Sequence, residues 1–420
     1  MSNDALHKTR TLWLVGALHA FTHLYYVALI PLYLLIQRDF QFASVGQATS
    51  LVTVQMVAYF LPSYALGVLA DRVSRKKLLG YGLAINGLGY VALALSPNYA
   101  CAVVAVILAG LGGSFYHPAA TAMIARLYPV NTGRALGLIG AGASGGFFVG
   151  PLYSGWRAAA LESVRGAAAW RTPILELGLL GIVAAGVFAW LAREEQPAPP
   201  VNIRDAARTP IFPTTVLWVW FFAAACAFSL RDFAGAGMGT MSSLFLQKAH
   251  GYDARLAGLA LSVLFIVSAI SNPLFGHLSD RGRKRWTASV TLVGASLMLV
   301  FPLVPGAWLI PCLAAYGFFF MSAYPMVEAE LMQSVPDAVR GRVFGLFITV
   351  GGLVGNLSHW IVGTHVKRMG EAAQSVAAYQ PLYAGIAALT VLSLLGLPCL
   401  HAIRKREHLF FRDADDVVVK

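Results

Sequence analysis

The chain of 420 residues is 58% hydrophobic and only 12% charged, whereas a soluble domain carries roughly 25% charged residues. Its formal net charge of +12 would suit a nucleic-acid-binding protein, but the charges are concentrated in the breaks between apolar runs. Because runs of about 20 residues are long enough to cross a bilayer, the composition excludes a soluble globular protein and indicates a multi-pass membrane protein.

The apolar runs predict twelve membrane spans, which makes the expected fold an all-α membrane protein. A polar, proline-rich segment after the sixth span predicts a linker between two six-helix bundles. We expect an N-terminal bundle over 1–192, a linker over 193–211, a C-terminal bundle over 212–403 and a tail over 404–420. The predicted spans are 11–36, 47–70, 78–97, 100–127, 135–156, 173–192, 212–247, 255–279, 287–305, 307–334, 343–366 and 379–403.

The distribution of basic residues predicts the orientation of these spans. Placing the N-terminus inside puts 22 of the 31 Lys and Arg residues on the cytoplasmic side, as the positive-inside rule requires. We therefore expect both termini in the cytoplasm of a bacterial-type inner (plasma) membrane. The basicity then reports topology, and no nucleic-acid partner is expected.

Polar residues in the first and fourth spans are candidates for a binding site. In the first span, His19 and His23 are four residues apart and share a helix face, to which Tyr26 also belongs. In the fourth span, Tyr116 precedes His117 within a glycine-rich stretch. We expect His19, His23, Tyr26 and Tyr116 to line a cavity within the membrane and to contact a bound molecule there.

A charged junction follows the second span and recurs half a chain later, after the eighth. In each copy an aspartate stands four residues after a glycine, on the same helix face, and a basic cluster follows. Such an aspartate can pair with a neighbouring helix or a basic loop and hold the cytoplasmic side shut, although the charges could equally serve topology alone. The predicted gate residues are Gly67, Asp71, Arg72, Arg75, Gly276, Asp280 and Arg281.

Internal repetition supports the division into two bundles. Pro118 and Pro129 in the first half have the same spacing as Pro325 and Pro336 in the second. The repeat indicates that one membrane unit has been used twice.

Twelve spans, a central linker and two Gly-x-x-x-Asp-Arg junctions resemble the major facilitator superfamily, which implies two six-helix bundles around a central cavity. Ala109 to Ala120, followed by a glycine-rich fifth span ending in Gly150-Pro151, is similar to the fosmidomycin-resistance type of efflux protein. Those relatives commonly carry acids where this chain has His23 and Ala119. A proton-coupling role at those two positions is therefore not carried over.

Arg231 and Asp232 in the seventh span are the most deeply placed ionisable residues, and such groups are functional candidates by default. A guanidinium can hold an anionic substrate through two parallel hydrogen bonds, while Asp232 can exchange a proton. Because adjacent helical residues point about 100° apart, we expect the two side chains to face different directions. The alternative is a structural ion pair. By-eye alignment of the halves places Arg231 opposite His19.

Glu328 in the tenth span shares a helix face with Tyr324. We expect Tyr324 to contact the substrate and Glu328 to couple protons, whereas Glu330 should bond to a basic loop. His117 and His359 are expected to be structural histidines, each satisfied by a neighbour. His19 and His23 could instead ligate a metal, but no carboxylate or thiol completes a local site.

The remaining patterns argue against catalysis. The chain contains no nucleophile constellation, metal motif or nucleotide-binding loop, so we expect no enzyme activity, no cofactor and no bound metal. The four cysteines are far apart in apolar spans, which predicts buried free thiols. They are Cys101, Cys226, Cys312 and Cys399.

These observations favour a monomeric secondary transporter that exports a small polar or anionic organic molecule in exchange for protons. Three alternatives remain open. The same fold could take up an organic acid, or export a metal-chelating metabolite, which the histidines of the first span favour. A membrane receptor without net transport is the third, although the tail is short for an output domain.

Overall fold

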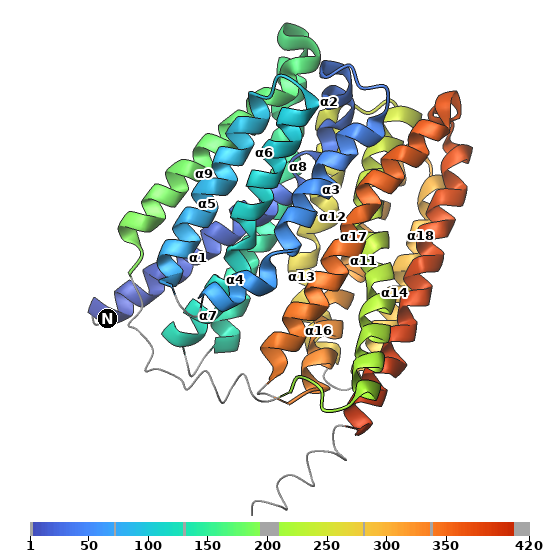
Figure 1. The fold of residues 1–420 in the computed structure, drawn as a ribbon. Coiled ribbons are helices and arrows are strands. Elements are labelled where there is room, and N and C mark those ends of the chain that lie inside the picture. Colours follow the sequence, from blue (N-terminus) through green and yellow to red (C-terminus); the bar gives the residue numbers. More distant parts are fainter. Residues whose placement is uncertain are drawn as a thin grey trace, which may run out of the picture.

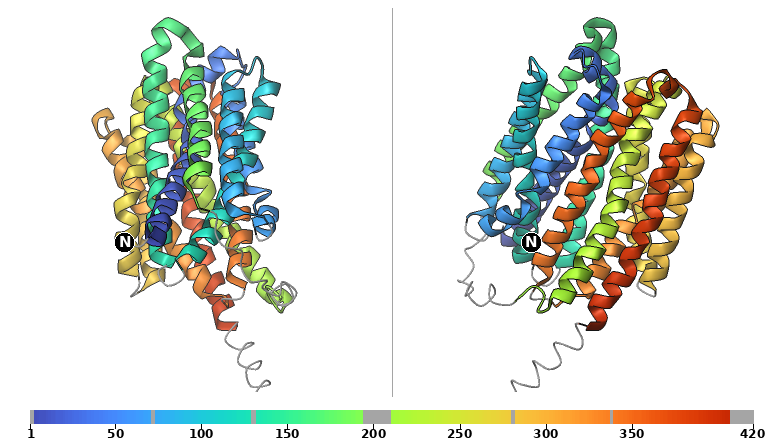
Figure 2. Two further views of the ribbon diagram at one scale, coloured as in Figure 1. Left: turned by 90° about the vertical axis from the view of Figure 1, so that its left-hand side faces the viewer. Right: turned by 45° about the vertical axis from the view of Figure 1, so that its right-hand side comes forward.

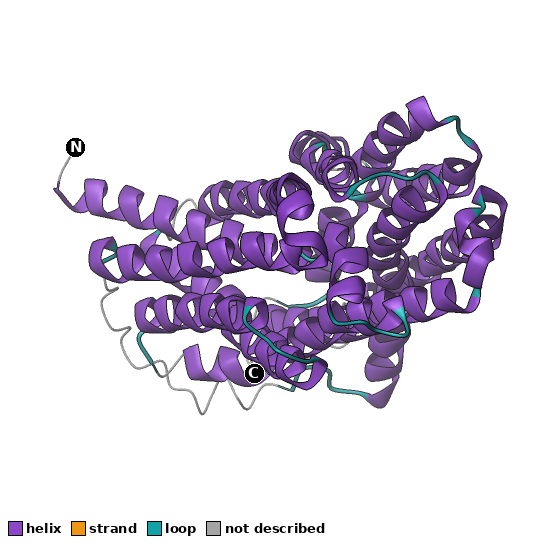
Figure 3. Cartoon of the chain, turned by 90° about the horizontal axis from the view of Figure 1, so that it is seen from above, coloured by secondary structure: helices purple, strands orange, loops and turns teal. Residues whose placement is uncertain are grey.

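The computed structural model describes residues 3–70, 73–128, 132–193, 210–279, 282–336 and 339–406. Within these ranges the ordered elements are all helices (Figure 3). Nine stretches are long and apolar enough to cross a membrane. One of them, 135–191, contains two helices, and the helices over 45–70 and 75–94 supply two further passages, which completes the expected twelve.

The first six passages form the N-terminal half (Figure 1). The first passage is one membrane span over Leu6–Asp39, which confirms the predicted span 11–36, and a short 3-10 helix at Pro31 separates its two α-helices. The elements are α1 (Asn3–Val27), η1 (Ile30–Leu32), α2 (Tyr33–Asp39), α3 (Val45–Phe60), α4 (Ser63–Ala70), α5 (Arg75–Ala94), α6 (Tyr99–Ser114), α7 (Tyr116–Leu127), α8 (Thr132–Arg165), η2 (Gly166–Trp170) and α9 (Arg171–Leu191).

The other six passages form the C-terminal half. Its first helix, α11, runs without interruption for 35 residues, unlike its counterpart α1. The elements are α11 (Thr215–Ala249), α12 (Ala254–Ile266), α13 (Ser268–Ser279), α14 (Arg283–Val300), η3 (Phe301–Leu303), η4 (Gly306–Trp308), α15 (Leu309–Phe320), α16 (Ala323–Gln333), α17 (Arg340–Arg368), η6 (Gly370–Gln374), η7 (Val376–Tyr379), α18 (Gln380–Leu392) and η8 (Ser393–Leu395), after which the helix resumes over 396–406.

The fourth passage of each half is broken at an equivalent place. The third residue of α7 is Pro118, and the third residue of α16 is Pro325. Proline lacks a backbone N–H and is tolerated in the first turn of a helix, so each proline favours a new helix start just before it. This break puts His117 and Tyr324 at matching positions, one residue before each proline.

The two halves pack closely through α8 and α12, at the end of the molecule away from the N-terminus, which is labelled in the lower part of Figure 2. There α8 crosses α12 with glycine on both helices. A Cβ atom at Gly155 would lie 2.2 Å from the carbonyl oxygen of Ala254, and one at Gly258 would lie 2.2 Å from that of Pro151. The buried Ser262 hydroxyl donates to the Phe148 carbonyl at 2.7 Å. Only glycine permits this closeness.

Some glycines nearer the other end of the molecule have open space beside them. Cβ atoms built at Gly137, Gly140 and Gly145 of α8, or at Gly345 of α17, would meet no described atom within 4 Å. The glycine-mediated contact between α8 and α12 therefore lies at the end of the molecule away from the N-terminus, which we call the closed end, while Gly352 of α17 packs on Phe60 of α3 further along.

The cysteines are free, as expected, but the prediction that all four are buried is wrong. Cys101 and Cys226 are exposed, and Cys312 and Cys399 are half-buried. In an apolar span, a small hydrophobic side chain can face lipid as readily as protein, so an apolar sequence does not distinguish the two. Most of the linker (194–209) and the end of the tail (407–420) lie outside the described residues.

Candidate functional site

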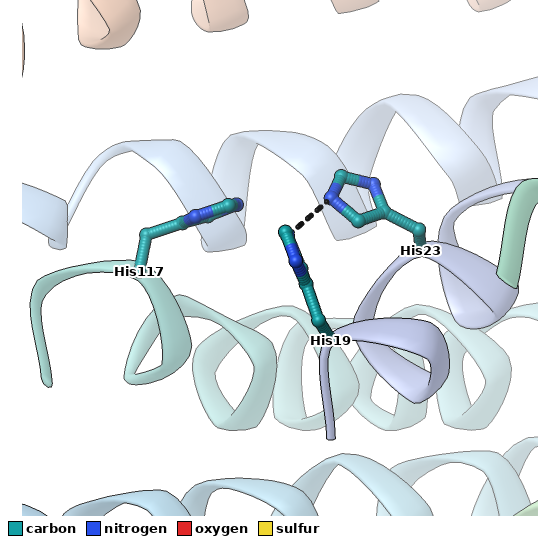
Figure 4. A group of neighbouring side chains, drawn as sticks. All are labelled: His19, His23 and His117. Carbon is teal, nitrogen blue, oxygen red and sulfur yellow. Dashed lines mark hydrogen bonds between the residues drawn. The ribbon is translucent and has the colours of Figure 1, made fainter. Parts of the chain in front are cut away.

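Three histidines from two passages of the N-terminal half converge. His19 and His23 lie one turn apart on α1, and His117 is the second residue of α7. Their rings point toward one another (Figure 4), and one ligand nitrogen of each lies within 4.8 Å of the others. The expectation that His117 is a structural histidine satisfied by a neighbour is wrong: within the described part of the chain it makes ring contacts but no hydrogen bond.

The ring of His19 is fixed on two sides. Its Nδ1 lies 2.8 Å from the carbonyl oxygen of Ile139 on α8, and its plane stacks on Tyr116 at 4.7 Å between centroids. The Tyr116 hydroxyl donates to the Val15 carbonyl at 2.9 Å. Because a carbonyl can only accept, His19 donates through Nδ1–H. Its Nε2 then carries the lone pair, and it lies 3.0 Å from Nε2 of His23.

Phe147 of α8 connects this cluster to the interface between the halves. Its ring centroid lies 4.3 Å from that of His23 and 5.8 Å from that of Tyr26. On its other side it stacks on Phe265 of α12 at 4.8 Å. Phe147 was not among the residues predicted to form a site, because aromatic residues in apolar spans mostly pack or face lipid.

Tyr26 shares the histidine face of α1 but reaches the other half. Its hydroxyl donates to Oδ1 of Asn356 on α17 at 2.7 Å. His359, one turn further along α17, contacts the same oxygen at 3.2 Å and also bonds Thr240 of α11. Thr53 of α3 donates to the Asn356 backbone carbonyl at 2.8 Å. His359 is thus satisfied by neighbours, as predicted, while Asn356 was missed although a lone Asn in an apolar span is a usable signal.

In the C-terminal half, Arg231 is paired with Asp232. Nε and Nη2 of Arg231 lie 3.0 and 2.8 Å from Oδ1 of Asp232, and the guanidinium carbon lies 3.9 Å from the centroid of the Tyr324 ring. The expectation that the two side chains face different directions is wrong. Their Cα–Cβ bonds diverge, but the long arginine side chain bends back onto its neighbour. The Arg231 side chain is only 3% exposed, that of Asp232 18%.

Glycines of α17 make room for Asp232. A Cβ atom at Gly351 would lie 2.4 Å from Oδ2 of Asp232, and one at Gly355 would lie 2.9 Å from its Cβ. The carboxylate is therefore enclosed between α11 and α17, and the glycine spacing of one turn on α17 sets its position.

Two further carboxylates lie on α16. Glu328 is half-buried and within electrostatic range of both Arg231 and Asp232, and its proton-coupling role stays a prediction. Glu330 is buried, and its Oε1 has no hydrogen-bond partner among the described residues. The expected bond from Glu330 to a basic loop is not seen there.

The predicted gate is only partly described. Arg75 is the first residue of α5 and is buried, while Gly67 lies in α4 and Gly276 in α13. A Cβ atom at Gly276 would meet no described atom within 4 Å, so this glycine does not mark a close helix contact in the state seen here. The remaining four gate residues, Asp71, Arg72, Asp280 and Arg281, lie outside the described residues, and the gate role stays a prediction.

A pocket of about 690 Å³ lies at the closed end, between the loops of the two halves. Its lining includes Arg38, Glu162 and Lys248 but none of the predicted site residues. The polar clusters within the membrane, rather than this pocket, are the candidate site.

Comparison with known proteins identifies the class to which the fold and these intramembrane clusters belong. A model of the Major Facilitator Superfamily matches residues 12–359, and the chain belongs to this family. It is a membrane transporter protein with multiple membrane-spanning helices.

Three known proteins illustrate the similarity. The chain is 22% identical over 388 residues to the fosmidomycin resistance protein of Escherichia coli (strain K12), covering 89% of this chain and 92% of the relative. It is 24% identical over 367 residues to the enterobactin exporter EntS of Shigella flexneri, covering 82% of each. Its fold matches a crystal structure of a D-xylose-proton symporter with a TM-score of 0.73 at 17% identity, over 92% of this chain and 96% of the other.

Proposed function

We propose that this transporter works by alternating access and exports a small polar or anionic organic molecule in exchange for protons. The membrane is a bacterial-type inner membrane with both termini in the cytoplasm. In that orientation, the close contact of α8 with α12 lies on the outer side, which supports a state closed to the outside. The names of the relatives, one a resistance protein and one an exporter, support export.

The observation that carries proton coupling is the grouping of one guanidinium with two carboxylates inside the membrane. Arg231 neutralises Asp232, and Glu328 shares their environment without an ion-pair partner of its own among the described residues. An uncompensated charge in the bilayer is costly, by about 2.5–3.5 kcal/mol or more. A proton on Glu328 removes that cost, and a hydrogen-bond donor of a polar substrate reduces it at the same carboxylate, so that the two compete as exchange requires.

The Arg231–Asp232 contact favours a second candidate, the uptake of an organic anion together with a proton. A proton on Asp232 would release the guanidinium, which could then bind an anionic group through the same donors. In this mechanism substrate and proton bind together, whereas in the exchange mechanism they displace one another. The two mechanisms therefore differ in the sign of the coupled proton movement.

Transport into proteoliposomes that enclose a pH-sensitive dye distinguishes these functions. Candidate anions are added in turn under an imposed pH gradient, and the screen begins with fosmidomycin. Export by exchange predicts substrate movement opposite to the proton movement, and co-transport predicts movement in the same direction. Transport that is indifferent to the gradient would refute proton coupling altogether.

The acids themselves are tested by Asp232→Asn and Glu328→Gln. Each variant should lose gradient-driven transport yet keep substrate-for-substrate exchange, because only net transport requires protonation and deprotonation in each cycle. Glu371→Gln, an exposed glutamate of η6, is the matched control and should behave as the wild type. Full gradient-driven transport in both acid variants would rule out the carboxylates as couplers.

A further inference from the structure

We propose that His19, His23 and His117 form a binding site for a divalent transition-metal ion of the Zn²⁺ class, with a coordination position left open. The inference concerns binding by the chain itself. It does not depend on the direction or the coupling of transport.

The first argument is convergence. The three rings come from α1 and from the start of α7, where the helix break before Pro118 orients His117. One ligand nitrogen of each ring lies within 4.8 Å of the others. Nitrogens that bind one tetrahedral zinc at 2.0–2.1 Å lie about 3.3 Å apart, so small side-chain rotations suffice to bring all three onto one ion.

The second argument is that the tautomer and the orientation of the His19 ring are already fixed. Metal-bound histidines usually donate their second ring N–H to a carbonyl or carboxylate, which fixes both the tautomer and the ring orientation. His19 does this with the Ile139 carbonyl at 2.8 Å, while stacking on Tyr116 fixes the ring plane. The Nε2 lone pair is thereby directed into the cluster, where it accepts from Nε2–H of His23 at 3.0 Å, a contact that a bound ion would replace.

The third argument is the incomplete bonding of the other two rings. Nδ1 of His23 is buried without a hydrogen-bond partner among the described residues, and His117 makes no hydrogen bond with them. Buried polar groups in native proteins are normally paired. The one bond between His23 and His19 leaves ring nitrogens of this cluster unused, and a bound ion would give each histidine a partner.

The donor set selects the ion. Three neutral imidazoles suit Zn²⁺, Ni²⁺, Co²⁺ or Cu²⁺, whereas Mg²⁺ and Ca²⁺ prefer oxygen ligands. Three protein ligands leave a position for water or for a donor atom of another molecule. His23 and His117 remain partly exposed, so the cluster is accessible to a ligand.

The absence of negative charge among the three histidines leaves two possible sources of the ion, a free ion and an ion within a chelate. The three-residue group contains no carboxylate or thiolate, so a bare divalent ion would bring an uncompensated charge into the membrane. An ion that arrives within an anionic chelate would carry its own compensation. Both sources share the same coordination by three imidazoles, and they differ in whether the free ion binds.

The test uses the full-length chain with its affinity tag removed, in lipid nanodiscs. Co²⁺ is titrated while the visible absorption of the bound ion is recorded, and Zn²⁺ is then used as a competitor. We expect a single class of site, displacement of Co²⁺ by Zn²⁺, and no displacement by Mg²⁺. A parallel titration uses Zn²⁺ with one equivalent of citrate: tighter binding of this complex than of the free ion identifies the chelate as the source.

His117→Ala is the informative variant, because His117 makes ring contacts only and its loss breaks no hydrogen bond in the described structure. Its affinity for Co²⁺ and for the citrate complex should fall by more than the roughly 10- to 100-fold that loss of an outer-shell partner costs. His365→Ala, at an exposed position of α17, is the matched control and should bind as the wild type. His23→Asn provides a second variant if His117→Ala unfolds.

Unchanged metal binding in His117→Ala and His23→Asn would overturn the proposal. Equal losses in His365→Ala and His117→Ala would also overturn it, because they would indicate surface binding. No binding of either Co²⁺ or the zinc citrate complex by the wild type would do the same, and it would leave the transport proposal standing.

Discussion

Adding one methyl group at Gly155 should shift the transporter toward the state that is open at the end now closed. In the structure, the Cβ of an alanine there would lie 2.2 Å from the Ala254 carbonyl oxygen on α12, whereas ordinary C···O contacts begin near about 3.3 Å. The helices must therefore separate by roughly 1 Å. Overpacking of this kind costs about 1–3 kcal/mol, which corresponds to roughly a 5- to 150-fold change in the ratio of the two states.

The assay measures labelling of a cysteine placed at Ser262, which is buried in this contact. The four native cysteines are replaced first, and the rate of reaction with a soluble maleimide is recorded in detergent. Gly155→Ala should label faster, by up to the stated ratio. Gly145→Ala is the matched control: it lies on the same helix, changes helix propensity equally, and its Cβ would meet no described atom within 4 Å.

Two results would refute this reasoning. If Gly155→Ala lowers the melting temperature but leaves the labelling rate unchanged, the clash acts on folding and not on closure. If Gly145→Ala accelerates labelling as much as Gly155→Ala does, the effect comes from helix propensity and not from the contact with α12.

Two further predictions concern charged residues. Arg231→Ala should destabilise the protein by about 3–5 kcal/mol, since it leaves Asp232 buried without its partner. In a thermal melt, the Arg231→Ala, Asp232→Ala double variant should recover part of that loss. Full stability of the single variant would show that water replaces the guanidinium. Asp71→Asn should leave substrate affinity close to normal but slow the transport cycle, because it removes a predicted latch; a large loss of affinity at an unchanged cycling rate would contradict the gate.

Local features of the sequence were sufficient to predict the membrane-spanning helices but not the breaks within them. Apolar length fixes where a segment crosses a membrane, because no other backbone conformation satisfies its hydrogen bonds in lipid. The breaks before Pro118 and Pro325 do not follow from residue type alone, because Pro151 and Pro273 lie inside unbroken helices. The pairing of His19 with His23 is local, since residues four apart share a face.

The clusters themselves were decided by packing between helices. The position of His117 beside His19 and His23 depends on how α7 packs against α1. The position of Asp232 depends on two glycines of α17. The hydrogen bond from Tyr26 to Asn356 joins residues of different halves. Helical periodicity gives the direction in which a side chain points around the axis of its helix. The distance from that side chain to a neighbouring helix depends on how the two helices are rotated, shifted and spaced relative to each other. Those quantities are set by contacts between residues far apart in the sequence, and only the tertiary structure contains them.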